Sequence, residues 1–136
     1  MRAVLDTNVL ISVLIKSGKP RRLLRALLSP SHTVIISEPI VEEFSRVSAD
    51  EKVRRYVDDE VLTGFLAAIL SRATFVTLES KIHVLNDSDD KILATAKDGE
   101  ADYVITGDRH MLELSSFGQT KIMTVDQALG ILRGKR

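Results

Sequence analysis

Short runs of β-branched and aliphatic residues alternate along this chain with segments in which apolar residues recur at helical spacing. This alternation constrains the fold more than any other feature, because strands separated by helices pair in parallel and need a helical cover on both faces. We therefore predict an α/β fold of three layers. The expected strands are residues 2–6, 33–36, 74–77, 103–106 and 121–123.

The helices between these strands are predicted from apolar periodicity and from capping residues. Pro20 can open one helix, and Thr124 forms a capping box with Gln127 before the last one. The other expected helices are residues 8–15, 38–47, 61–70 and 87–97. The highly charged residues 49–60 are the expected flexible connection.

The composition fits one domain, residues 1–136, with an aliphatic core. Hydrophobic residues make up 44% of the chain and aromatic residues 4%, which is enough for one buried sheet. No apolar run approaches the roughly 20 residues of a membrane span, and Asp6 falls too early for a secretory signal. Cysteine is absent, which excludes disulfides and thiolate metal sites. These features favour the cytoplasm.

Acidic residues occur where a parallel α/β sheet places its functional groups. Asp6 and Asp108 each follow a predicted strand, and in such folds ligands bind outside the carboxyl ends of the strands. For Asp6 the alternative is a capping residue at a strand-to-helix turn. Glu43 shares a helix face with Ile40 and Val47, where a carboxylate needs a cation or donors. Its alternative is a half-exposed edge of that face.

Two neighbouring acids compete for the next position. Asp89 is in register with the apolar residues Ile92 and Leu93, whereas Asp90 is rotated further from that face. We therefore prefer Asp89 as the inward acid. The alternative explanation for both is the favourable position of acids near the N-terminus of a helix.

These four acids, Asp6, Glu43, Asp89 and Asp108, come from four distant segments and are expected to meet. Without a cation they would repel one another strongly. Oxygen ligands without cysteine or a well-placed histidine favour Mg²⁺ or Mn²⁺ over zinc. The sequence therefore predicts a divalent metal site.

Several segments, in this order along the chain, resemble those of PIN-domain nucleases. They are LDTNVL (5–10), the helix that contains Glu43-Phe44, DDKILATA (89–96) and ADYVITGD (101–108). The resemblance extends from Val4 to about Leu132, and it is greatest to the VapC-like toxins of prokaryotic toxin–antitoxin pairs.

The resemblance implies a parallel sheet of order 3-2-1-4-5 and hydrolysis of RNA phosphodiesters with Mg²⁺ or Mn²⁺. It assigns metal binding and catalysis to Asp6, Glu43, Asp89 and Asp108. Supporting roles fall to Asn8 and Thr106, which would orient ligands or water, and to Asp90. The alternatives are a helix cap for Asn8 and a strand-end hydroxyl for Thr106.

The resemblance also implies partners: an RNA substrate, an antitoxin protein that restrains the nuclease, and a second copy of the chain. Helix 61–70 offers an apolar surface for a homodimer, but this surface could equally pack into the core of the monomer. Nineteen basic residues balance nineteen acidic ones, so RNA must be drawn in by a local patch. The candidate patch consists of Lys16, Lys19, Arg21, Arg22 and Arg25, which could equally be a solvated helix face.

Other functions stay open at this stage. The chain could be an RNA-processing nuclease outside any toxin pair, or a catalytically silent PIN module that only binds. A phosphatase-like enzyme with Asp6 as nucleophile is disfavoured, because that chemistry usually needs a second aspartate two residues later, where Asn8 stands.

Overall fold

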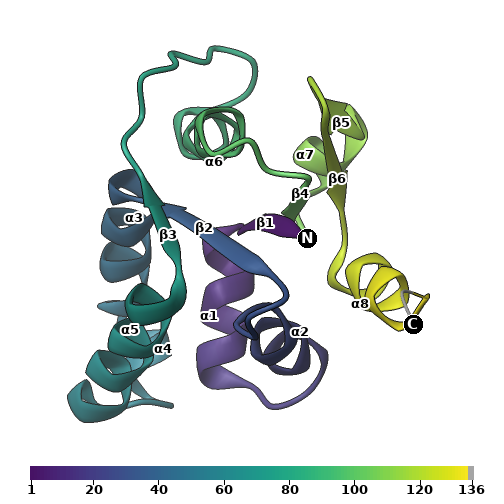
Figure 1. The fold of residues 1–136 in the computed structure, drawn as a ribbon. Coiled ribbons are helices and arrows are strands. Elements are labelled where there is room, and N and C mark those ends of the chain that lie inside the picture. Colours follow the sequence, from purple (N-terminus) through teal and green to yellow (C-terminus); the bar gives the residue numbers. More distant parts are fainter. Residues whose placement is uncertain (135–136) are drawn as a thin grey trace.

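The computed structural model describes residues 1–134, which form a central sheet between layers of helices (Figure 1). The strand order is β3-β2-β1-β4-β6-β5. The strands are β1 (Arg2–Leu5), β2 (Thr33–Ser37), β3 (Thr74–Val76), β4 (Tyr103–Ile105), β5 (Ser116–Phe117) and β6 (Thr120–Met123).

The five predicted strands are all present and all parallel, in the predicted order 3-2-1-4-5 when β6 is counted as the fifth. One further strand, β5, was not predicted. It pairs antiparallel with β6 through a turn at Gly118, whose φ of 60° suits glycine. A strand of two residues is too short to leave a periodic signal in the sequence.

Eight helices connect the strands in the described part of the chain. They are α1 (Thr7–Ile15), α2 (Lys19–Leu27), α3 (Glu38–Ser48), α4 (Glu51–Arg54), α5 (Asp59–Arg72), α6 (Asp87–Asp98), α7 (Arg109–Leu114) and α8 (Val125–Gly134). In Figure 1, α6 lies on one face of the sheet and α1 and α2 lie on the other. The predicted capping box precedes α8, where the backbone N–H of Gln127 donates to the hydroxyl of Thr124.

Residues 49–60 were predicted to be a flexible connection, and that prediction is wrong for most of the segment. Asp50 caps α4 by accepting a bond from the Lys52 backbone, and Val53 and Val57 are buried in the core. The prediction failed because these two apolar side chains, four residues apart, lie among many charged residues. Helix α7 was also not predicted, because it has six residues and buries only Met111.

The core lies between the two central strands and the helices on either side. Val4, Val104 and Ile105 are fully buried, and α6 packs Leu93 against the sheet. One close approach depends on glycine at the end of α6. A Cβ on Gly99 would stand 2.6 Å from the Ile35 side chain and 2.9 Å from the Thr95 carbonyl oxygen.

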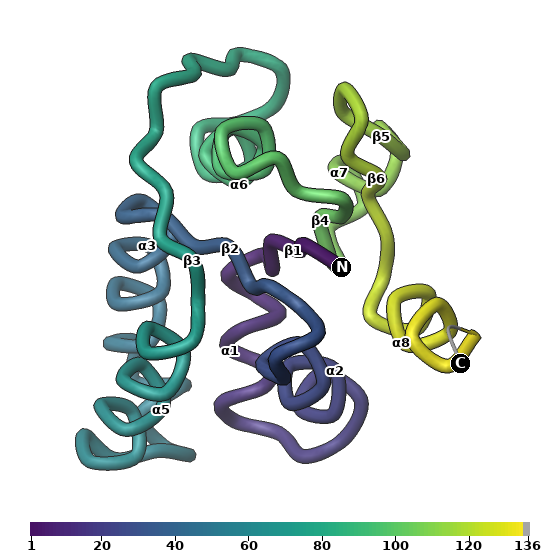
Figure 2. The backbone as a smooth tube through the Cα atoms, in the orientation of Figure 1, coloured from purple at the N-terminus to yellow at the C-terminus, as the bar shows by residue number. Residues whose placement is uncertain are grey.

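The long connection from β3 to α6 passes over the top of the molecule in Figure 2. Two acids of α6 hold it. Asp98 accepts bonds from the backbone of Glu79 and Ser80, and Asp90 accepts bonds from the backbone of Val84 and Leu85. In residues 1–134, no helix combines the length and the apolar character that crossing a membrane requires.

Candidate functional site

The candidate site begins where the two central strands end. Asp6 follows β1 and Thr106 follows β4, and both residues are buried. The hydroxyl of Thr106 donates to Asp6 Oδ2 at 2.6 Å and accepts from the Asp108 backbone N–H at 3.0 Å. One hydroxyl therefore fixes the orientation of the Asp6 carboxylate and the position of the chain that carries Asp108.

Asp6 stands at the N-cap position of α1, where its side chain makes no capping hydrogen bond of ordinary geometry, although the backbone N–H groups of Asn8 and Thr7 lower the pKa of its carboxylate against the larger effect of burial. The backbone carbonyl of Asp6 accepts the first bonds of the helix instead, from Val9 and Leu10. The carboxylate therefore keeps an electrostatic contact with the start of α1 beside its hydrogen bond to Thr106.

Helix α6 contributes the next acid in its first turn. The Asn86 side-chain amide donates to Asp89 Oδ2 at 2.9 Å, and the Asp89 backbone N–H donates back to Asn86 Oδ1 at 2.9 Å. Asp89 lines the same cavity as Asp6, whereas Asp90 does not. Asp90 is equally buried, but its bonds go to the loop before α6, so it acts as a structural brace there.

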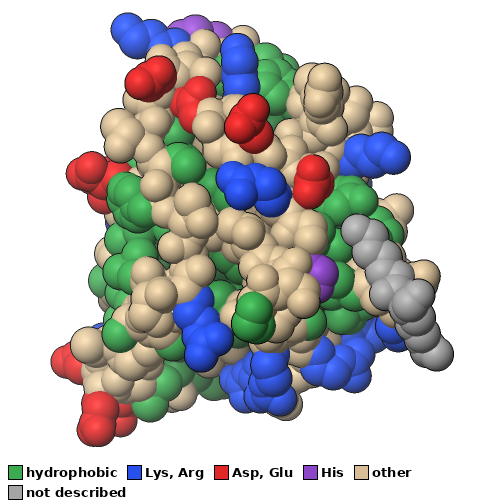
Figure 3. Space-filling view, in the orientation of Figure 1, with side chains coloured by type: hydrophobic (Ala, Val, Ile, Leu, Met, Phe, Trp, Pro, Cys, Tyr) green, Lys and Arg blue, Asp and Glu red, His purple; other side chains and the backbone are tan. Residues whose placement is uncertain are grey.

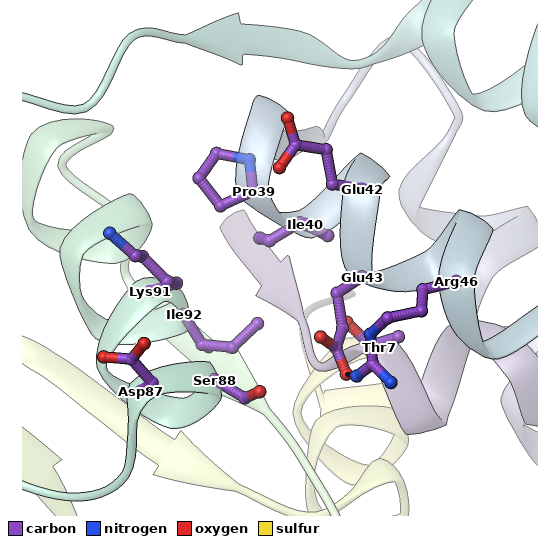
Figure 4. Close-up of a pocket in the computed structure, with 10 residues that line it drawn as sticks. All are labelled: Thr7, Pro39, Ile40, Glu42, Glu43, Arg46, Asp87, Ser88, Lys91 and Ile92. Atoms are coloured by element: carbon purple, nitrogen blue, oxygen red, sulfur yellow. Dashed lines mark hydrogen bonds and ion pairs between the residues drawn. The ribbon is translucent and has the colours of Figure 1, made fainter.

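Glu43 reaches the cavity from α3, where its side chain is 27% exposed. It is half-buried rather than buried. Arg46, one turn later, pairs with Glu43 Oε1 at 2.6 Å. Figure 4 shows a neighbouring pocket that shares Glu43 with this cavity, and in it the Glu43 and Arg46 side chains meet beside Thr7, across from Ser88 and Ile92 of α6.

Asp108 is the N-cap of α7. Its Oδ1 accepts bonds from the backbone of His110 and Met111, at 2.8 and 3.2 Å. The His110 ring lies on the surface, with Nδ1 3.8 Å from the same oxygen. The capping bonds hold the carboxylate at the mouth of the cavity.

One cavity brings the four predicted acids together: Asp6, Glu43, Asp89 and Asp108 all line it, with Thr7, Asn8, Asn86, Ser88 and Ile92. Burial raises the pKa of Asp6, and the charge of Asp108 raises it further, while the Thr106 hydrogen bond opposes both. Burial also raises the pKa of Asp89, helped by the charges of Asp108 and Asp6. These three carboxylates therefore repel one another across the cavity.

The chemistry of this lining suits a hard divalent cation, because its charged donors are all carboxylates. The geometry is less complete. Within residues 1–134, no three acidic or histidine side chains are arranged as a ready metal site. The Glu43–Arg46 pair commits one of the four carboxylates elsewhere, but the three aspartates do not form a ready site by themselves either. Mg²⁺ needs only a few carboxylates and keeps several waters, so the acids fit such an ion if Glu43 exchanges its partner.

The basic patch is partly committed to structure. The Arg21 guanidinium donates to the Val13 carbonyl oxygen, and Lys19 pairs with Asp126 at 2.9 Å. The other three residues, Lys16, Arg22 and Arg25, are exposed. Figure 3 shows Lys and Arg side chains along the lower edge of the molecule, around the place where α2 lies in Figure 1.

Asn86 and Ser88 also line the cavity, although neither was predicted to belong to the site. Asn86 is the N-cap of α6, directly before the expected helix 87–97. The feature that could have indicated its role is its position three residues before Asp89, because a helix-capping residue there can also orient the carboxylate of Asp89. Asn8 and Thr106, which were predicted to support the site, line the cavity and bond to Asp6, respectively.

Comparison with known proteins gives the family. The sequence matches the PIN domain over residues 2–110, a range that contains all four acids, so the chain belongs to the PIN-domain family, whose members are generally nucleases. The fold is similar to the crystal structure of VapBC2 from Rickettsia felis bound to a DNA fragment from their promoter, with a TM-score of 0.63 and 17% identity. That match covers 91% of this chain and 98% of the other. No curated protein sequence matches the chain.

Proposed function

We propose that this protein, as one PIN domain, is a divalent-metal-dependent endoribonuclease. The observation that carries the proposal is the group of Asp6, Asp89 and Asp108, held in one cavity by partners that orient them against their mutual repulsion. A structural role would not need three carboxylates to face one another, and charge of one sign in a cavity is costly unless a cation is to bind.

Asp6, Glu43, Asp89 and Asp108 would hold Mg²⁺ or Mn²⁺. Such an ion, when bound, supplies a water of lowered pKa as nucleophile and offsets the charge that develops on the phosphate. The residues of the chain orient the ligands: Thr106 directs Asp6, Asn86 directs Asp89, and the first turn of α7 directs Asp108. Asn8, on the cavity wall, would position water or substrate.

We further propose that the nuclease is the toxin of a type II toxin–antitoxin pair and works in the cytoplasm. The resemblance of its motifs to VapC-like toxins supports this, as does the likeness of its fold to VapBC2. The antitoxin would cover the acidic cavity with Arg or Lys side chains that compete with the metal. An RNA-processing nuclease outside any such pair is the alternative.

A homodimer is part of the same proposal. Helix α5 buries only Ile69 fully, and large apolar side chains are exposed on it and close to it in sequence, namely Tyr56, Val61, Leu70 and Phe75. Burying such residues is a usual function of a subunit interface. Sedimentation of the parent and of Leu70→Glu would test it, since a dimer through α5 should dissociate.

The decisive experiment is cleavage of defined single-stranded and structured RNAs with Mn²⁺ and with chelator. Asp6→Asn should abolish cleavage, whereas Glu113→Gln, an exposed acid on α7, should cleave like the parent. Metal-independent cleavage, or full activity of Asp6→Asn, would refute the proposal. Toxin and processing functions are separated by expressing the protein with and without the neighbouring small reading frame. A toxin arrests growth only when expressed alone.

A further inference from the structure

A second cavity adjoins the acidic one on the side away from α3. It lies among the first turns of α1, α2 and α8 and the turn between β4 and α7, and its volume is about 350 Å³. Its walls include Asn8, Val9, Ser12, Gly107 and Val125. We call it the α1–α8 groove. This volume is within the range of small-ligand sites in proteins.

The groove is continuous with the proposed catalytic cavity. Asn8 lines both, and Thr106, which bonds to Asp6, forms part of the groove wall. Gly107 separates that threonine from Asp108. Whatever occupies the groove is therefore directly beside a phosphate held at the carboxylates. This inference rests on the proposed ribonuclease function.

The charges of the two cavities differ. The acidic cavity is lined by four carboxylates, whereas the charged residues of the groove are Lys19 and Asp126, which neutralise each other at 2.9 Å. A groove without net charge attracts neither a phosphate nor a basic side chain. A nucleotide matches this arrangement of charge, because it has a phosphate that a cation in the acidic cavity would bind and an uncharged base that could occupy the neutral groove.

The groove walls also suit a base. Val9 and Val125 offer aliphatic surface to a flat ring, and the Asn8 amide and the Ser12 hydroxyl offer donors and acceptors to its edge. The Thr124 hydroxyl, also on the wall, is occupied by the Gln127 backbone. Because one amide and one hydroxyl can adapt to several hydrogen-bonding patterns, the groove suits bases in general.

Gly107 lies on the groove wall and offers a position at which the groove can be altered. Its φ is not in the left-handed region, and a Cβ built on it meets nothing within 4 Å. Neither backbone strain nor packing therefore requires glycine at this position. A side chain there would instead occupy open space on the groove wall, next to Asp108.

From these observations we infer that the α1–α8 groove binds one nucleobase of the RNA strand, on a nucleotide adjacent to the phosphodiester that is cleaved. The Lys19–Asp126 pair spans the groove from α2 to α8, and both side chains are more than half exposed. Such a pair contributes little to stability, so it can open to admit the base.

The test uses a short single-stranded RNA that the parent cleaves at one mapped bond. A set of copies each carries one abasic nucleotide at successive positions. Binding is measured by fluorescence anisotropy in Mg²⁺, in the parent background with Asp6 retained and with the mapped bond of each RNA replaced by an uncleavable linkage, so that the RNA stays intact. The parent background should lose roughly five- to tenfold in affinity at one position beside the mapped bond, the low end for one base, because the groove is aliphatic rather than aromatic.

Gly107→Leu should fill the groove. Its affinity for the intact RNA should therefore be about as low as the affinity of the parent background for that abasic RNA, and abasic substitution should lower it no further. Gly64→Leu is the control, since Gly64 also has open space around a Cβ but lies on α5. If Gly107→Leu does not fold, Ser12→Leu narrows the groove from the opposite wall. Unchanged affinity in the folded variant, or an abasic effect that persists in it, overturns the groove assignment alone. Absence of RNA cleavage by the parent overturns the proposed function as well.

Discussion

The Arg46 guanidinium lies 2.6 Å from the Glu43 carboxylate, so one of the four cavity acids is already paired with a basic side chain of the same helix. The Arg46 side chain is 69% exposed, so solvent screens the pair and makes it weak. A pair of this kind contributes little to stability, so a divalent ion that binds Glu43 would have little to overcome in displacing Arg46. The proposed metal site would therefore require Glu43 to exchange Arg46 for the cation.

Removing Arg46 should strengthen metal binding. In Arg46→Gln the Glu43 carboxylate no longer has to leave a cation, so the affinity for Mn²⁺ should rise by up to about fivefold, as expected for a screened surface pair. Titration calorimetry with Mn²⁺ measures this directly. Arg22→Gln on α2 is the control for the loss of one positive charge. Equal or weaker binding by Arg46→Gln would show that the pair does not compete with the metal.

Asp89→Asn should be more stable than the parent in chelator at neutral pH. The pKa of Asp89 is raised in the folded protein, so the parent loses stability as the pH rises from the unfolded-state pKa through the folded-state value. Asparagine removes that loss and can keep the Asn86 hydrogen bond, so Tm should rise by a few degrees. Melting curves between pH 3 and pH 8 test this. The difference should shrink as the pH falls below the ordinary aspartate pKa of about 3.9, and a difference independent of pH contradicts the argument.

Divalent cations should raise the Tm of the parent by mass action, because they bind only where the fold gathers the carboxylates. At a concentration about 100 times Kd the gain is about 2.7 kcal/mol. Scanning calorimetry with increasing Mg²⁺ measures it, with Na⁺ at equal ionic strength as control. The same titration of Asp6→Asn should give a much smaller shift. A parent without any Mg²⁺-dependent shift would exclude a metal site of useful affinity.

Thr106→Val should reduce kcat/KM by about 10- to 100-fold, the usual effect of losing a group that orients a metal ligand. Valine keeps the shape of threonine but can neither donate to Asp6 nor accept from the Asp108 backbone. Thr106→Ser keeps the hydroxyl and should restore most of the activity. If valine and serine variants are equally active in RNA cleavage, the Thr106 hydroxyl has no part in the site.

Asp90→Ala should destabilise the fold by about 1–3 kcal/mol, because it leaves the backbone N–H groups of Val84 and Leu85 without their acceptor. Asp90→Asn retains a carbonyl oxygen and should lose less. Urea denaturation monitored by circular dichroism gives both values. The contrast with Asp89→Asn is informative, since neighbouring acids of equal burial should change stability in opposite directions.

Periodicity was sufficient to predict the five parallel strands and to prefer Asp89 over Asp90 for the cavity. Both are consequences of local geometry, since the turn of a helix fixes which of two neighbouring residues faces the sheet. The role of Asp90 as a loop brace could not be predicted, because it depends on the path of residues 77–86, which have no repeating pattern. The Glu43–Arg46 pair was not predicted either. Its spacing of three permits contact, but only the structure shows that the pair forms at the cavity.

The bond between Thr106 and Asp6 joins residues that are one hundred positions apart in the chain. Asp6 is synthesised one hundred residues before Thr106, so its carboxylate gains its orienting hydroxyl only after β4 has been made. Thr106 itself is held by the Met123 carbonyl oxygen on β6. A nascent chain thus carries Asp6, Glu43 and Asp89 without the strand that assembles them. The acidic cavity can therefore be assembled only after β4 and β6 have been made, and a fragment that ends before β4 would lack the arrangement on which the proposed nuclease function depends.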